Sequence, residues 1–271
     1  MSEEKNTKNT ALPSPVALVK ESWATYTEHI LRFVTLMAIP FFVGMLVLGI
    51  FLVLGWITGP SLIVGILFSM LSVLLMILIQ VWGQVAIMFG IIHVEEKQDI
   101  KTIYKNAWSV LGVFLGTSLL SALTIVGGMF LAILPGIFFG VLVSFSSFIV
   151  LKEKKSFFDA LMQSARYVSG RWWSVFGRLL FLIAMAIVAS DGTAWLFGLI
   201  SPMVGDLVST AISFALIPFF VLYAYRLYIS LKNSYHASEE SRSISRPWFV
   251  GLATFGLLAP IAMILLVVFL R

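Results

Sequence analysis

Long apolar runs recur along the whole sequence and leave few choices of fold. A run of about 20 apolar residues, coiled as a helix, matches the thickness of a bilayer. Lipid offers no hydrogen bonds, so a spanning segment is either a helix or a strand of a closed barrel, and these runs lack the alternating pattern of about ten residues that marks barrel strands. The sequence therefore predicts an all-α, polytopic transmembrane helix bundle. We place its seven spans at about 33–57, 62–93, 108–132, 136–151, 172–190, 206–230 and 248–270.

Composition supports the same fold class. Of the 271 residues, 60% are hydrophobic and 11% are charged, and the mean hydropathy is +1.02. A soluble domain is about 45–50% apolar and about 25% charged, so no soluble fold can bury this much apolar surface. The chain contains no cysteine, which excludes disulfides and thiolate ligands. Its net charge of +5 does not indicate a nucleic-acid partner, because the basic residues are spread along the borders of the spans.

The basic residues predict how the spans are oriented. Lys and Arg near the ends of spans favour the cytoplasmic side of a membrane. With the N-terminus placed in the cytoplasm, 17 of the 18 basic residues fall on that side and only Arg271 falls outside. The loops around Gly59, Pro135 and Asp191 carry none. We therefore expect a multi-pass protein of the plasma (inner) membrane with a cytoplasmic N-terminus and an external C-terminus.

The polar segments divide the chain into four parts. We expect a disordered cytoplasmic N-terminus at 1–14, a membrane domain at 15–232, a cytoplasmic linker at 233–246 and a C-terminal transmembrane helix at 247–271. Between two of the spans, the stretch 191–205 is apolar but interrupted by Gly192, Gly198 and Pro202. A re-entrant piece, an interfacial piece and a loop all remain open for it.

Short amphipathic segments precede three of the spans. Their apolar residues recur at helical spacing over about 15–33, 98–107 and 156–168. Ser14 before Pro15 predicts the start of the first segment. Ser156 and Asp159 fit a capping box at the start of the third, and Gly170 fits its stop.

A short sequence recurs at the start of two spans. Trp108-Ser109-Val110-Leu111-Gly112 opens the third span and Trp173-Ser174-Val175-Phe176-Gly177 opens the fifth, each after an amphipathic segment. Residues 15–93 fit the same order of elements. The sequence therefore predicts an internal repeat of three units, each an amphipathic helix plus a hairpin, followed by an extra C-terminal span.

Four segments in the middle of the chain form a pattern of turn, short amphipathic helix and Trp-led span. They are Leu134-Pro135-Gly136-Ile137, Phe148-Ile149-Val150-Leu151-Lys152-Glu153, Ala160-Leu161-Met162-Gln163-Ser164 and Gly170-Arg171-Trp172-Trp173-Ser174-Val175-Phe176-Gly177. The pattern resembles the membrane domain of some glycerophosphoryl diester phosphodiesterases and of related uncharacterised bacterial polytopic proteins. In the two-domain relatives, hydrolysis belongs to a separate soluble barrel, and this chain has no soluble segment long enough to hold one. The resemblance therefore implies an orphan membrane domain and carries over no catalytic residue.

A few polar side chains lie inside the predicted spans. Gln80 and Gln84 are one helical turn apart in the second span, and Ser144 lies in the fourth. Amides and hydroxyls in hydrocarbon need partners, so these three residues are candidates for a polar intramembrane site or pathway. The simpler interpretation is that they hydrogen-bond to neighbouring helices, which typically contributes about 0.6–2 kcal/mol.

Glycines predict close helix packing in the middle of the chain. Gly112 with Gly116, and Gly136 with Gly140, form two G-x-x-x-G pairs. The two pairs lie at opposite membrane depths and should not meet within one hairpin. Gly127-Gly128, at the outer end of the third span, is the better-placed partner for Gly136 and Gly140.

Basic residues beside apolar faces predict contact with anionic lipid headgroups on the cytoplasmic side, at about 1 kcal/mol per residue. The residues concerned are Lys101, Lys105, Lys154, Lys155, Arg166 and Arg171. Positive-inside topology alone requires the same charges and no ligand, so both interpretations stay open.

No catalytic, cofactor-binding or metal-binding constellation is evident in the sequence, and no cofactor is expected. His29, His93 and His236 lie singly at span borders rather than as a ligand pair. Our leading hypothesis is a non-catalytic integral membrane protein that organises or binds lipids or partner proteins. Two alternatives are a small-solute transporter or channel subunit, which needs a polar path, and a membrane enzyme acting on lipid headgroups, which needs clustered acids, bases or metal ligands.

Overall fold

The computed structural model describes residues 12–58, 62–96, 98–235 and 246–269. These residues form ten helices and no strand. The helices are α1 (Pro15–Glu28), α2 (Ile30–Ile57), α3 (Leu62–Ile92), α4 (Ile100–Leu131), α5 (Ile133–Val143), α6 (Ser146–Glu153), α7 (Phe157–Val168), α8 (Trp172–Gly198), α9 (Pro202–Ser234) and α10 (Arg246–Phe269).

Seven segments of the described chain are long and apolar enough to cross a membrane. They are α2, α3, α4, α5 together with α6, α8, α9 and α10. This confirms the predicted all-α fold with seven spans, and the chain is a polytopic membrane protein. Exposed tryptophans mark both ends of α8, where Trp173 is 78% and Trp195 is 71% exposed. At 1.5 Å per residue they lie about 33 Å apart, close to the hydrocarbon thickness of about 30 Å.

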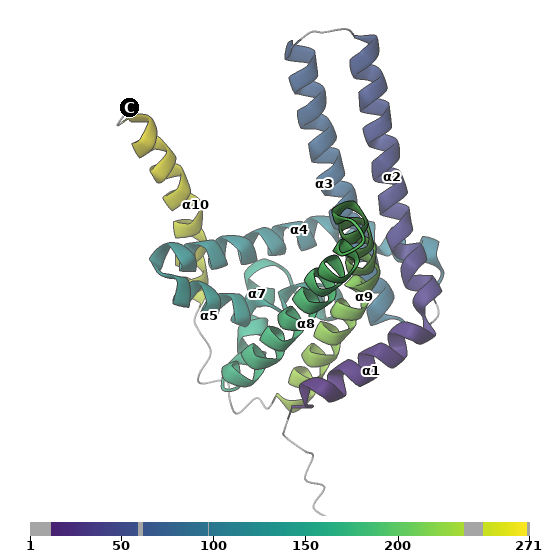
Figure 1. Cartoon of the computed structure of the whole chain (residues 1–271). Coiled ribbons are helices and arrows are strands. Elements are labelled where there is room, and N and C mark those ends of the chain that lie inside the picture. Colours follow the sequence, from purple (N-terminus) through teal and green to yellow (C-terminus); the bar gives the residue numbers. More distant parts are fainter. Residues whose placement is uncertain (1–11, 59–61, 97, 236–245, 270–271) are drawn as a thin grey trace, which may run out of the picture. The chain divides into compact units, whose positions relative to one another are not determined.

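Contacts divide the chain into two compact units, Thr25–Leu115 and Met1–Ala24 with Gly116–Arg271. In the first of these, α2 and α3 run side by side as a long hairpin (Figure 1). Side chains of α2 fill the notches that glycines leave in α3. A Cβ atom added at Gly83 would lie 2.6 Å from Cγ of Pro40, and one added at Gly90 would lie 2.6 Å from Cδ1 of Leu36. These glycines therefore let the two helices approach closely.

Polar bonds fix the base of the α2/α3 hairpin. The Arg32 guanidinium donates to the carbonyls of Val94 (3.1 Å) and Gln98 (3.0 Å), and so holds the segment that follows α3. The Tyr104 hydroxyl of α4 donates to the Leu36 carbonyl at 2.6 Å. The Trp82 indole of α3 in turn donates to the Tyr104 carbonyl at 3.2 Å. The first turns of α4 are thereby tied to both helices of the hairpin.

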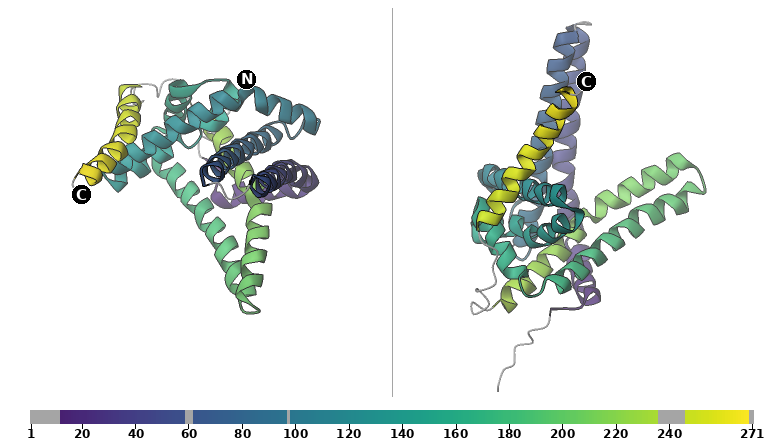
Figure 2. Two further views of the ribbon diagram at one scale, coloured as in Figure 1. Left: turned by 90° about the horizontal axis from the view of Figure 1, so that it is seen from above. Right: turned by 90° about the vertical axis from the view of Figure 1, so that its left-hand side faces the viewer.

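In the other unit, α8 and α9 form a second long hairpin (Figure 2). Near its turn the two backbones touch, because a Cβ atom added at Gly205 would lie 2.6 Å from the Ala194 carbonyl oxygen and 2.8 Å from the Gly198 nitrogen. Further along, the Ser209 hydroxyl donates to the Ser190 carbonyl at 2.8 Å.

Helix α7 lies within the same unit and contacts α5, α6, α9 and α10. Most of its residues are buried, including Leu161, Ala165 and Val168. Its strongly amphipathic sequence therefore reflects packing against neighbouring helices on its apolar face.

Several predicted boundaries need correction. The segment 98–107 is not a separate amphipathic helix, because α4 runs unbroken from Ile100 to Leu131. The stretch 191–205 is neither re-entrant nor a long loop. Instead, α8 continues to Gly198 and α9 starts at Pro202, with the Ser201 hydroxyl accepting from the Val204 N–H at 3.2 Å. The broken stretch is thus the tip of a hairpin.

The predicted helix caps have different outcomes. The Ser14 hydroxyl accepts from the Ala17 N–H at 3.2 Å, which confirms the predicted start of α1. The Ser156 side chain makes no capping bond within the described chain. The expected capping box therefore does not form, and another hydroxyl takes its place at the start of α7. Gly170 follows α7 with φ +83°, as expected of a stop.

Candidate functional site

The fourth span is interrupted in its middle, and a serine from α7 hydrogen-bonds to the backbone groups at the break. Between α5 and α6 the helix breaks at Ser144 and Phe145. The Ser164 hydroxyl donates to the Leu142 carbonyl at 2.6 Å and accepts from the Phe145 N–H at 3.2 Å. Backbone groups freed inside a membrane must find partners within the protein, and Ser164 supplies one for each of these two.

Further hydroxyls lie close to this interruption. Ser121 of α4 and Ser146 of α6 share a hydrogen bond of 3.1 Å. Thr117 of α4 accepts from the Phe157 N–H at 3.0 Å, so it caps α7 in place of Ser156. Phe157 has φ +48°, a left-handed conformation that a non-glycine residue adopts only where its surroundings stabilise it. Hydrogen bonds from hydroxyl groups thus join α4, α6 and α7.

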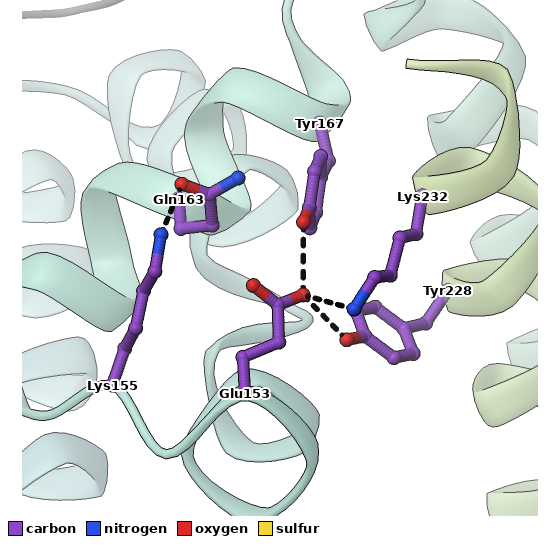
Figure 3. A network of polar contacts seen from close by, with 6 residues as sticks. All are labelled: Glu153, Lys155, Gln163, Tyr167, Tyr228 and Lys232. Atoms are coloured by element: carbon purple, nitrogen blue, oxygen red, sulfur yellow. Dashed lines mark hydrogen bonds and ion pairs between the residues drawn. The ribbon is translucent and has the colours of Figure 1, made fainter.

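At the far end of α6, the carboxylate of Glu153 collects three donors on one oxygen (Figure 3). Oε1 accepts from the Tyr228 hydroxyl at 2.7 Å and from the Tyr167 hydroxyl at 2.8 Å. The Lys232 ammonium lies 3.2 Å from the same oxygen. The Glu153 side chain is 11% exposed, so this charge-assisted cluster lies largely out of solvent. We call these four residues the Glu153 cluster.

Aromatic rings enclose the Glu153 cluster. The Tyr228 ring stacks on Phe148 with centroids 5.7 Å apart, and the Tyr167 ring meets Tyr235 edge-on at 5.2 Å. Burial, together with the nearby Glu153 carboxylate, raises the pKa of Tyr167 to about 12. Tyr167 therefore stays a neutral phenol, able to donate its hydroxyl proton, throughout the physiological pH range.

The arrangement acts as a polar tie between three helices. Glu153 ends α6, Tyr167 comes from α7, and Tyr228 and Lys232 lie one turn apart on α9. The neighbouring Gln163 of α7 accepts from the Lys155 ammonium at 2.7 Å. One turn of α7 therefore bonds to the segments at both ends of α6, through Ser164 on one side and through Gln163 and Tyr167 on the other.

The Glu153 cluster was not predicted from the sequence. Glu153 stands out in the sequence only as part of the family-like pattern, and its partner Tyr228 is 75 residues away along the chain. The one sequence feature that points to this cluster is a single carboxylate, Glu153, directly after a long apolar run and between two lysines. Such a residue gains from a cationic or phenolic partner, but spacing alone does not say which one.

The three residues predicted for a polar intramembrane site lie in different units. Gln80 and Gln84 are exposed on α3, and neither amide has a hydrogen-bond partner among the described residues. Ser144 is exposed in the other unit and donates to the Val141 carbonyl of its own helix at 2.9 Å. A shared pathway through these residues stays a prediction.

The residues predicted to contact anionic lipids differ in their surroundings. Lys101, Lys105 and Lys154 are exposed. Lys155 is bonded to Gln163, and Arg171 donates to the hydroxyl and carbonyl of Ser234 at the end of α9. Arg166 is half-buried on α7. The first three of these residues therefore offer the most accessible positive charge.

The predicted packing glycines also differ from one another. A Cβ atom added at Gly136 would lie 2.3 Å from Met129, and Gly136 in turn lies against Gly128, as predicted for the two arms of one hairpin. Gly140 has only an ordinary contact, with Ile125 at 3.9 Å. Gly116 receives the Phe157 ring of α7 rather than a helix backbone, and Gly112 has no described neighbour within 4 Å.

One close glycine contact was not expected. Gly127 of α4 packs on α10, where a Cβ atom would lie 2.0 Å from the Leu252 carbonyl oxygen and 3.0 Å from the Gly256 nitrogen. The C-terminal span therefore joins this unit through backbone contact with α4.

Among the described residues, no group of three or more His, Asp or Glu side chains is placed to hold a metal ion. His93, which directly follows α3, instead contacts the Phe89 carbonyl of that helix at 3.1 Å, while His236 lies outside the described residues. Comparison of the chain with family models, with curated proteins and with solved structures returns no match.

Proposed function

We propose that the protein is a non-catalytic membrane component that binds anionic lipid headgroups through basic and aromatic side chains at the ends of its spans. One observation carries the proposal. Lys101, Lys105 and Trp108 recur at i, i+4 and i+7 on α4, all three are exposed, and Trp108 is 66% exposed. Lysines beside an interfacial tryptophan form a surface that attracts anionic headgroups while the indole sits at headgroup level.

The other unit offers a similar surface. Lys152 and Lys154 are exposed where α6 ends, and Trp173 is exposed where α8 begins. Lys154 has φ +55° at the end of α6, which places it in the turn rather than within the helix. Two surfaces of the same chemistry support a role in organising lipids, or partner proteins through them.

Binding to vesicles of defined composition tests the proposal. We expect the chain to prefer phosphatidylglycerol over phosphatidylcholine, and the preference to fall as salt rises. The triple variant Lys101→Gln, Lys105→Gln, Lys154→Gln should lose about 3 kcal/mol of that preference, on the order of 100-fold. Lys155→Gln is the matched control, because its ammonium is already bonded to Gln163. Equal binding of both lipids by the unmodified chain would refute the proposal.

The orientation and the repeat belong to the same proposal. We infer a bacterial plasma membrane, a cytoplasmic N-terminus, an external C-terminus and three related hairpin units that resemble the phosphodiesterase membrane domain. The basic residues near α4, α6 and α8 support the orientation. Reporter fusions after residues 59, 135 and 271 should report the outside, and fusions after 10, 98 and 154 the inside. A cytoplasmic signal at 271 would contradict this topology.

A further inference from the structure

One face of α3 carries an unbroken stripe at the spacing of a coiled-coil seam. The stripe alternates steps of four and three residues, and every member of it is exposed. Its members are Ile66, Met70, Val73, Ile77, Gln80 and Gln84. Steps of four and three are the spacing at which two helices pack with a left-handed crossing. We call these six residues the α3 seam.

The α3 seam is separate from the face that packs on α2. The residues facing α2 include Met76, which reaches Gly44, and Gly83, which receives Pro40. At 100° per residue, these two residues lie roughly 80–100° around the helix from the centre of the seam. The α2/α3 hairpin therefore leaves the seam free to contact another molecule.

The two amides of the α3 seam are unusual on a lipid-facing surface. At 1.5 Å per residue, Gln80 lies about 27 Å along α3 from Leu62, and Gln84 about 33 Å. Gln80 is thus within a hydrocarbon layer of about 30 Å, and Gln84 is at its edge. An amide in lipid without a partner is costly, and neither has one among the described residues.

We propose that two copies of the chain associate in parallel through the α3 seam, with Gln80 and Gln84 each bonded to its counterpart. All copies of a membrane protein insert in the same orientation. A two-fold axis along the membrane normal therefore brings identical residues together at identical depth. A glutamine amide both donates and accepts, so it pairs with its own copy, whereas a different partner would need polar groups at both depths.

The surface beside the α3 seam has the shape that such packing uses. Two hollows of about 470 and 650 Å³ flank it, and Val73 and Ile77 line both. The first hollow also includes Gln80 and, from α2, Leu48. Side chains from a second copy would enter these hollows as knobs enter holes, and the amide pairs would set the register.

Cross-linking in bilayer nanodiscs tests the seam directly, because the chain has no cysteine of its own. Single substitutions Val73→Cys and Ile77→Cys should form disulfide-linked dimers on oxidation. Leu75→Cys and Leu78→Cys, which are half-buried on a different face of α3 and line neither hollow, are the matched controls and should stay monomeric. Equal cross-linking at both sets of positions, or monomers from all four variants, would overturn the proposal. So would cross-links of the seam cysteines to other membrane proteins alone.

The amides are tested by the double variant Gln80→Leu, Gln84→Leu. We expect the dissociation constant of the dimer to rise about tenfold, with a factor of roughly three from each amide pair. Thr35→Val removes a polar group elsewhere on the same hairpin and should leave dimerisation unchanged. A leucine variant that dimerises as tightly as the unmodified chain would refute the amide pairing. The cysteine variants keep both amides, so they test the seam even if the leucine variant misfolds.

Discussion

The α2/α3 and α8/α9 hairpins are alike in outline but differ in how their two helices touch. In α2/α3, a flexible side chain such as Leu36 fills the notch of a glycine, Gly90, on the opposite helix. In α8/α9, the backbone at Gly205 lies directly against that of Ala194 and Gly198. Side chains in notches can shift slightly, whereas touching backbones leave no room to shift. The two hairpins should therefore differ in their tolerance of the same substitution.

The two hairpins are also alike in their anchoring. Near the start of each, an arginine donates to two backbone carbonyls of an adjoining segment. Arg32 holds Val94 and Gln98, while Arg178 holds Leu12 (3.0 Å) and Pro13 (2.8 Å). A planar guanidinium suits this task because it directs several donors at once. The anchor chemistry is thus shared even though the helix contacts are not.

The largest difference between the hairpins is expected from Gly205→Ala and Gly90→Ala. The new methyl group of Gly205→Ala meets backbone atoms and should destabilise the fold by about 2–3 kcal/mol. The methyl group of Gly90→Ala meets the end of the flexible Leu36 side chain and should cost about 1–2 kcal/mol. Gly177→Ala, with no described neighbour within 4 Å, is the control and should melt unchanged or slightly higher. Thermal unfolding in micelles measures all three, and equal losses at Gly205 and Gly90 would contradict this difference between the hairpins.

Replacing either arginine should release only the segment that this arginine holds. Arg32→Met and Arg178→Met each leave two carbonyls without a charged donor and should cost about 2 kcal/mol. Limited proteolysis should then cut near Val94 in the first variant and near Leu12 in the second. Lysine at either position keeps the charge but loses the paired geometry, so it should restore only part of the stability. Identical cleavage patterns would mean that the arginines do not hold these segments.

The α8/α9 hairpin has a second attachment, through the Glu153 cluster, which Glu153→Gln should weaken. The amide still accepts hydrogen bonds from the two tyrosines but no longer pairs with the Lys232 charge. We expect a loss of about 1–2 kcal/mol in thermal unfolding. Glu28→Gln, which removes a largely exposed carboxylate, is the control and should have little effect. A variant as stable as the unmodified chain would show that the ion pair contributes nothing.

The smallest effect concerns Tyr167 at alkaline pH. Tyr167→Phe should cost about 1 kcal/mol at neutral pH, because it removes one donor to Glu153. The pKa of Tyr167 is raised to about 12 in the folded chain, against about 10 when unfolded. The unfolded state therefore loses its proton first, and the advantage of the unmodified chain is present below pH 10 and declines up to about pH 12. A pH-independent difference between the two chains would contradict this assignment.

The spans could be predicted from the sequence because their cause is local. Twenty apolar residues in lipid must form a helix whatever surrounds them, so all seven were found. The predicted helix boundaries were wrong where contact with a neighbouring helix determines where a helix begins or ends. The amphipathic segment at 98–107 continues into the third span as one helix, whose first turns Tyr104 and Trp82 tie to the α2/α3 hairpin, and sequence periodicity does not contain that information.

Contacts between distant segments could be predicted only where the sequence left a single suitable partner. Gly128 and Gly136 had to meet because they flank one tight turn. Gly127 packs on α10, and Glu153 bonds to α9, although many other partners of the same size or charge exist in the sequence. The hydroxyl bonds around Ser164 could not be predicted either, because a serine in a span can bond to many different partners.

The serine that completes the interrupted span has a consequence for how the chain is made. Ser164 follows Phe145 by 19 residues, so the fourth span leaves the ribosome well before the hydroxyl that bonds to its break. Until α7 has been synthesised and folded back, the Phe145 N–H lacks that partner. The fourth span therefore reaches its final hydrogen bonding only when α7 packs against it, so the interruption and the helix that satisfies it must be assembled together.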